Sequence, residues 1–292
     1  MPGLKTETIE VRGATTRIMR NGASGAPLVF LHGGVPGVTP YCSGMHVWGG
    51  ALDRFAAERS VIALDLPGSG GTDLSGEITL DLLSRHVRAT LEALGIARCH
   101  VIGHDLGGLL AFGLAVDAPA LVSAVTAVAS VAAAPTGDGV ENLSLAYPPS
   151  PRWTRVSQAW AFERVSYSHR HIDDALLAAC VDAADGRPHQ EALRRMAAGE
   201  NGESFVPSLM KAKSRFYEVC RTDGVPVPCQ VVWGSHDPLG SVDQGLWLFR
   251  GIAKRQRAAQ FHVINRAGAL PFREEPESFH QVVSAFADVV FP

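Results

Sequence analysis

The stretch of the chain with the clearest chemical potential is VIGHDLGG at residues 101–108, where an apolar run ends in small residues around Asp105. Gly103, Gly107 and Gly108 suit a sharp turn from a strand into a helix, because the two elements approach too closely there for larger side chains. Such a turn lifts its central side chain clear of the sheet, and the helix N-terminus below it favours negative charge. Asp105 is therefore a candidate catalytic carboxylate; an aspartate that only caps the helix is the alternative.

An aspartate at this turn predicts a chemistry that differs from that of a serine. A carboxylate needs no base to remove a proton, and it can displace a leaving group at a saturated carbon to give an alkyl ester of the enzyme. Water activated by a histidine would then hydrolyse this ester at the carbonyl carbon of Asp105. Backbone N–H groups near Gly33 or Gly34 and the N–H of Leu106 are the candidates to stabilise the oxyanion of this second step.

Short apolar runs alternate with helical patterns along most of the chain. The runs predict two short strands within 6–19 and further strands within 26–34, 60–73, 99–105, 123–130, 228–237 and 258–268, with a helix over 78–95 and another from Gly107. This alternation predicts an α/β fold with a mostly parallel sheet of about eight strands and helices on both faces. Because the carboxyl ends of parallel strands meet at one edge, Asp105 should converge there with Asp237, which follows the run CQVVWG.

The alternation is interrupted once, between residues 135 and 223. This segment lacks strand-like runs and holds helical patterns such as DDALLAACVDAADG and HQEALRRMAAG. We therefore expect a core formed by residues 1–134 and 224–292, with an inserted helical cap at 135–223.

Four spaced motifs in this order resemble those of the α/β-hydrolase superfamily over essentially the whole chain. They are LHGG at 31–34, the turn around Asp105, WGSHD ending at Asp237, and AGALPFREEPESF at 267–279. LHGGVPG and the cap pattern resemble carbon–carbon bond hydrolases that act on ring-cleavage products of aromatics, whereas Gly-His-Asp resembles epoxide hydrolases and haloalkane dehalogenases. The resemblance implies that Asp237 orients a catalytic histidine; a turn-forming aspartate is the alternative.

The last motif lacks the histidine that the resemblance implies. In those families it reads Gly-His, often followed by Leu-Pro-Phe, and here Ala269 occupies the histidine position within an otherwise intact frame. A single exchange of this kind favours a deliberate inactivation that would trap substrate, and a natural loss is the alternative. The cavity between Asp105 and Asp237 should then have room for an imidazole, and two carboxylates without an imidazolium should raise one pKa, leaving Asp105 partly protonated.

The residues around the turn and in the cap distinguish among substrates. Dehalogenases of the resembling families commonly carry a tryptophan after the nucleophile, and Leu106 at that position argues against a halide. An epoxide hydrolase needs an acidic O–H, usually a cap tyrosine, to protonate the opening oxygen. The candidate substrate-binding residues are His104, Tyr147, Trp153, Trp160 and Tyr167, with Tyr217 as a further cap tyrosine; core packing is the alternative for each.

The main hypothesis is a hydrolase that opens an epoxide of a small aromatic or cyclic substrate through an Asp105 ester, impaired by Ala269. One alternative is an enzyme similar to the carbon–carbon bond hydrolases, which use serine where this chain has Asp105. Another is a lyase, a cyclase or a ligand-binding protein on the same scaffold, with Asp105 as a base.

The amino-acid composition narrows the classes of molecule that this chain could bind. The 292 residues are 46% hydrophobic and 19% charged with net charge −3, which is typical of a globular protein and gives no reason to expect nucleic-acid binding. No signal-peptide pattern or membrane span is evident, and five scattered cysteines suggest reduced thiols in a cytoplasmic protein. We expect a small-molecule substrate, no membrane, no cofactor and no metal; a homodimer is left open.

Overall fold

The computed structural model describes residues 3–135, 145 and 147–291, and its centre is one eight-stranded sheet. The order across the sheet is β1-β2-β4-β3-β5-β6-β7-β8. The strands are β1 (Lys5–Val11), β2 (Ala14–Arg20), β3 (Leu28–Leu31), β4 (Val61–Leu64), β5 (Cys99–His104), β6 (Val122–Val128), β7 (Cys229–Gly234) and β8 (Ala259–Ile264). β1 and β2 form an antiparallel hairpin, β2 is antiparallel to β4, and all other neighbours are parallel. The expected mostly parallel sheet is confirmed.

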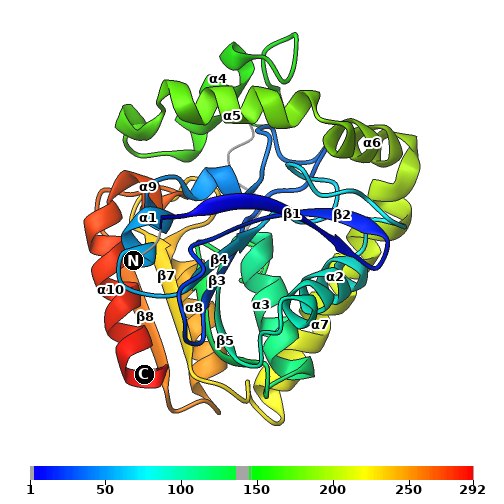
Figure 1. The fold of residues 1–292 in the computed structure, drawn as a ribbon. Coiled ribbons are helices and arrows are strands. Elements are labelled where there is room, and N and C mark those ends of the chain that lie inside the picture. The colour runs from blue at the N-terminus through cyan, green and yellow to red at the C-terminus, as the bar shows by residue number, and fades with distance from the viewer. Residues whose placement is uncertain (1–2, 136–144, 146, 292) are drawn as a thin grey trace.

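Helices cover both faces of the sheet, as Figure 1 shows. One face packs against α2 (Leu80–Ala93), α3 (Leu106–Asp117), α7 (Val206–Arg221) and α8 (Val242–Ala253). The other packs against the 3-10 turn η1 (Met45–Trp48), α1 (Ala51–Ala56), α9 (Pro271–Glu274) and α10 (Pro276–Val290). Because β3 to β7 are covered on both faces, their side chains are almost all buried, which explains the continuous apolar runs of the sequence.

The described residues of the segment between β6 and β7 hold helices and no strand, and residues 136–144 and 146 of the expected cap lie outside the described part of the chain. The helical elements are α4 (Arg155–Val165), η3 (His169–His171), α5 (Asp174–Asp185), α6 (Arg187–Arg195), the π-helical segment η4 (Met196–Phe205) and α7. In Figure 1, α4, α5 and α6 lie over the edge of the core. α7 instead runs beside α2 and α3, so its packing joins it to the core.

No helix in the described part of the chain is long and apolar enough to cross a membrane. The five cysteines are all buried and unpaired.

Candidate active site

The turn at Asp105 has the strained geometry that its small neighbours predict. Asp105 lies between β5 and α3 at φ 44° and ψ −110°, a conformation that L-residues rarely adopt. A Cβ atom added at Gly103 would lie 2.1 Å from the carbonyl oxygen of Gly107, and one at Gly108 would lie 2.5 Å from Ser130 Oγ. The close approach of strand and helix therefore excludes larger side chains, and the turn presents Asp105 beyond the carboxyl end of β5.

The Asp105 carboxylate lies between two loops of the core. Its Oδ1 accepts a hydrogen bond of 3.2 Å from the backbone N–H of Ala132, and Ser130 Oγ donates to the Asp105 carbonyl oxygen at 2.6 Å. On the other side, a Cβ atom at Gly33 would lie 2.7 Å from the Asp105 Cβ. The loop after β3 thus passes directly against the catalytic candidate.

The three residues expected to form the oxyanion site lie on this loop and at the start of α3. Gly33 contacts Asp105, and Leu106 is the first residue of α3. Gly34 has φ +84°, and a Cβ atom there would lie 2.0 Å from Ser43 Oγ. Their backbone positions suit the expected role, which stays a prediction.

Asp237 is held by the loop that follows β7. Its Oδ1 accepts a hydrogen bond of 2.9 Å from the N–H of Leu239, and its Oδ2 is buried without a partner among the described residues. The loop packs against the one after β8, because the N–H of His236 donates to the carbonyl oxygen of Ala267 at 2.9 Å. The loop that carries Asp237 is thus joined to the loop of position 269, and the convergence of the side chains on one pocket stays a prediction.

The pKa of the Asp237 carboxyl group is raised. Burial raises it to about 8, the N–H of Leu239 opposes this shift, and the charge of Asp105 reinforces it. At neutral pH Asp237 is therefore mainly protonated. A protonated carboxyl group in the site can act as an acid, and the partial protonation expected of Asp105 stays a prediction.

Ala269 lies in the loop after β8 and is 1% exposed. Its N–H donates to the carbonyl oxygen of Val165 at 2.9 Å, and its carbonyl oxygen lies 2.9 Å from His104 Nε2. The loop is therefore held by its backbone. An imidazole-sized space between Asp105 and Asp237 stays a prediction.

His104 serves as a packing residue in this structure. Its ring lies edge-on to Trp48 and Phe272, and the Ala269 carbonyl accepts from its Nε2. Burial lowers the pKa of His104, and the charge of Asp105 opposes this shift. A neutral imidazole bound in this way is fixed, and the expected contact with substrate stays a prediction.

Tyr41 is a site residue that the sequence analysis missed. It is 4% exposed, its ring lies 4.8 Å from that of Phe162 on α4, and burial raises the pKa of its phenol, with further increases from the charges of Asp105 and Asp237. The phenol therefore lies in electrostatic range of both carboxyl groups. It comes from the loop after β3. The sequence analysis considered only the tyrosines of the cap, and Tyr41 lies outside it.

Lys213 is a second residue that was missed. It lies on α7, where burial lowers the pKa of its amine and the charge of Asp105 opposes this shift. Four residues later, Tyr217 donates a hydrogen bond of 2.8 Å to the carbonyl oxygen of Ala133, next to the Ala132 N–H that binds Asp105. Because Lys213 and Tyr217 are four residues apart, they lie on the same face of α7. This face therefore contacts the loop beside Asp105, and the Lys213 amine lies in electrostatic range of the Asp105 carboxylate.

The other aromatic candidates of the cap have different surroundings. Tyr147 is 82% exposed, and Tyr167 is 47% exposed with its ring 4.4 Å from that of His236. Trp153 packs edge-on against His189, and Trp160 lies under the guanidinium of Arg164. Their roles in substrate binding stay predictions. Among the described residues, no group of three or more His, Cys, Asp or Glu side chains is arranged to hold a metal ion.

The sequence profile of the alpha/beta hydrolase family matches residues 28–282. The chain belongs to this family. It is 28% identical over 287 residues to a 2-hydroxy-6-oxononadienedioate/2-hydroxy-6-oxononatrienedioate hydrolase of Paraburkholderia phymatum, covering 94% of this chain and 92% of that one. A hydrolase of the same name from Cupriavidus pinatubonensis is 26% identical, covering 91% and 88% of the two chains.

Solved structures share the fold of this alpha/beta hydrolase. A meta-cleavage product hydrolase from Pseudomonas fluorescens superposes with a TM-score of 0.76 at 22% identity, covering 97% of each chain. This likeness agrees with the expected fold.

Proposed function

We propose that this alpha/beta hydrolase cleaves a carbon–carbon bond in a small conjugated keto acid of the ring-cleavage type. The observation that carries the proposal is a protonated Asp237 in electrostatic range of Asp105. The scaffold around them is similar, over more than nine-tenths of its length, to a 2-hydroxy-6-oxononadienedioate/2-hydroxy-6-oxononatrienedioate hydrolase. This ranks the carbon–carbon alternative above epoxide opening, which the sequence analysis put first.

The carboxyl pair supplies the proton transfers that such a hydrolysis needs. On the diketo tautomer of the substrate, Asp105 takes a proton from water as the water oxygen attacks the 6-oxo carbon, and Asp237 gives its proton to the carbonyl oxygen. Collapse of the hydrate breaks the C5–C6 bond and returns a proton to Asp237. The electron pair passes to the 2-oxo group, which takes the proton held by Asp105, so a carboxylic acid and a dienol leave.

Two further residues complete the proposed site. The Tyr41 phenol is a hydrogen-bond donor for the oxygen at which negative charge develops, because it lies in electrostatic range of both carboxyl groups. The Lys213 amine, which faces the Asp105 region from α7, is suited to pair with a substrate carboxylate. In this arrangement Asp105 acts as a base, and no covalent intermediate forms on the enzyme.

The test uses a 2-hydroxy-6-oxo-dienoate as substrate. Loss of the dienolate absorption and release of the carboxylic acid, measured by liquid chromatography and mass spectrometry, should occur with the chain and stop with Asp105→Asn. In ¹⁸O water the label should enter the acid product, and the intact protein should gain no mass. Dienoate that binds and stays unchanged at every pH between 5 and 9 would overturn the proposal.

Epoxide opening remains a second candidate because a carboxylate stands at the strained turn. Here Asp105 would attack a saturated ring carbon and form an ester, while Asp237 or Tyr41 protonates the ring oxygen. Incubation with small aryl epoxides would then add the substrate mass to Asp105. With neither an adduct nor turnover of either substrate class, a ligand-binding protein would remain.

A further inference from the structure

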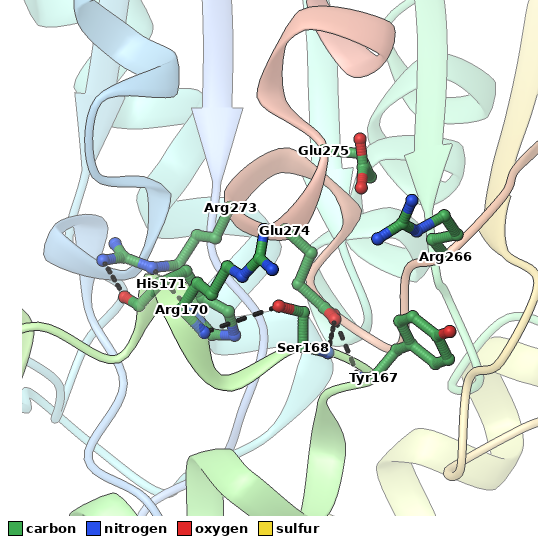
Figure 2. A pocket seen from close by; sticks show the side chains of 8 residues that line it. All are labelled: Tyr167, Ser168, Arg170, His171, Arg266, Arg273, Glu274 and Glu275. Carbon is green, nitrogen blue, oxygen red and sulfur yellow. Dashed lines mark hydrogen bonds between the residues drawn. The ribbon is translucent and has the colours of Figure 1, made fainter.

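A second pocket lies at the seam between the cap and the core, apart from the carboxyl pair. Its cavity of about 360 Å³ is lined by residues of the cap and of the core. The cap contributes Tyr167, Ser168, Arg170 and His171, and the core contributes Arg266, Arg273, Glu274 and Glu275. Figure 2 shows these side chains around the opening. We call this the seam pocket.

The pocket has two carboxylates, and both oxygens of one of them, Glu274, accept hydrogen bonds from backbone N–H groups. Glu274 Oε1 accepts from the N–H of Gly268 at 2.8 Å, and Oε2 accepts from the N–H groups of Tyr167 and Ser168 at 2.7 and 2.8 Å. The negative charge of Glu274 is thus directed to the backbone and away from the arginines. Glu275 is the remaining acid of the pocket.

Arg273 forms a fixed positive wall. Its side chain is 8% exposed, its Nη1 donates to the carbonyl oxygen of Val47 at 3.2 Å, and its Nη2 donates to that of His171 at 3.1 Å. Its Nε donates to His171 Nδ1 at 3.4 Å, and burial, followed by the charge of Arg273, lowers the pKa of His171 to about 4. His171 is therefore neutral at neutral pH and adds no charge.

Arg170 and Arg266 are the two exposed cations of the pocket. Neither guanidinium has a hydrogen bond or ion pair with the described residues, and the two belong to different walls, one in the cap and one in the core. The backbone of Arg266 is held at φ 60°, where its N–H donates to Ser235 Oγ and Asn265 Oδ1, each at 3.0 Å. Its side chain therefore projects from a fixed point beside the opening, on the same side as Glu275 (Figure 2).

We propose that the seam pocket binds a small oxyanion with at least two negative charges, such as a phosphate group or a dicarboxylate, between Arg170 and Arg266. Glu274 is bound to backbone N–H groups, and Arg273 Nη2 lies 3.7 Å from Asp173 Oδ2. The two unpaired arginines therefore face one uncommitted carboxylate, and positive charge predominates at the opening. Guanidinium groups suit such anions because they donate paired hydrogen bonds to two oxygens. The Ser168 hydroxyl and the Tyr167 phenol provide neutral donors at the same opening. An anion held there would link the cap loop to the core loop that carries Ala269.

The test is calorimetric titration of the full chain with inorganic phosphate, pyrophosphate and succinate at low salt. Arg170→Gln and Arg266→Gln should each weaken binding about tenfold or more, and added salt should weaken it further. Glu275→Gln should tighten binding, because it removes the competing carboxylate. Preference for the phosphates or for succinate would identify the ligand chemistry.

Two controls separate this site from general charge and from the carboxyl pair. Arg257→Gln removes an exposed arginine outside the pocket and should leave binding unchanged. Asp105→Asn should also leave it unchanged, so failure of the proposed reaction would not affect this result. Absence of binding at 10 mM of all three anions, or equal weakening by Arg257→Gln, would overturn the proposal.

Discussion

His104 Nε2 lies 2.9 Å from the carbonyl oxygen of Ala269, so the strained turn of Asp105 is joined to the loop after β8 by a hydrogen bond that does not involve the side chain at position 269. The N–H of Ala269 is bound as well, to the carbonyl oxygen of Val165. Because this anchoring uses only the backbone, it does not depend on which side chain stands at position 269.

The first prediction concerns Ala269→His. An imidazole at this position should lie between Asp105 and Asp237, serve as a general base and raise turnover of a substrate that is attacked by water by about a hundredfold to ten-thousandfold. Steady-state rates with the dienoate and with aryl epoxides measure this gain. Ala269→Gln is the control, since glutamine has similar bulk and no basic nitrogen; an equal gain with both variants would contradict the role of the base.

Single turnover of Ala269→His in ¹⁸O water then separates nucleophile from base. Label on Asp105 after turnover of an epoxide would mean that water attacks an enzyme ester, whereas label only in product would mean that water attacks the substrate directly.

The second prediction follows from the pKa of about 8 for Asp237. The folded chain holds a proton that the unfolded chain releases near pH 4, so the contribution of Asp237 to stability falls as pH rises from about 4 to 8, by at most about 1.4 kcal/mol per pH unit. Asp237→Asn removes this titration. Its melting temperature relative to the unaltered chain should therefore rise between pH 5 and pH 9, and a constant difference across this range would refute the raised pKa.

The pH dependence of kcat should reveal the same carboxyl group, that of Asp237. If Asp237 acts as the acid, kcat should decline as pH rises through about 8, because the proton that it donates is then lost. The Asp237→Asn variant should have lost this limb together with most of its activity.

The third prediction concerns Tyr41→Phe. The ring contact with Phe162 should be kept while the hydroxyl is lost, so the fold should persist and kcat should fall about tenfold to a hundredfold. Trp247→Phe is the control, because that aromatic side chain is 50% exposed on α8. Rates and thermal melts of both variants decide the matter; a Tyr41→Phe enzyme with an unchanged kcat would exclude the phenol from the reaction.

The fourth prediction tests the turn itself. Gly103→Ala places a Cβ atom 2.1 Å from the Gly107 carbonyl oxygen, a backbone atom that cannot move without separating β5 from α3, so we expect a loss of several kcal/mol in the free energy of unfolding. Gly113→Ala, in the middle of α3, meets no atom within 4 Å and should instead stabilise by about 0.5–1 kcal/mol. Urea denaturation of the two variants should give shifts of opposite sign.

The fold could be predicted from the sequence because the patterns that indicate its strands and turns are local. The buried runs of β3 to β7 and the glycines around Asp105 each follow from the residues beside them, so the parallel sheet and the turn could be predicted. The convergence of the Asp237 loop with that of Ala269 followed from the topology of parallel strands.

The missed residues depend on packing that no local pattern encodes. Tyr41 reaches the carboxyl pair because the loop after β3 folds under α4, and Lys213 does so because α7 runs beside α3. The pKa of Asp237 likewise depends on burial, which a sequence does not give residue by residue. The same holds for the seam pocket, where Arg170 and Arg266 are far apart in the chain.

Glu274 ties a loop of the cap to a loop of the core. Its carboxylate accepts from the N–H of Gly268 and from those of Tyr167 and Ser168, so we expect a displacement of one loop to be passed to the other as long as these bonds persist. Coupling of this kind is reciprocal. A ligand that displaces the cap loop will shift the backbone beside position 269, and a side chain that fills position 269 will in turn alter how firmly the cap loop is held.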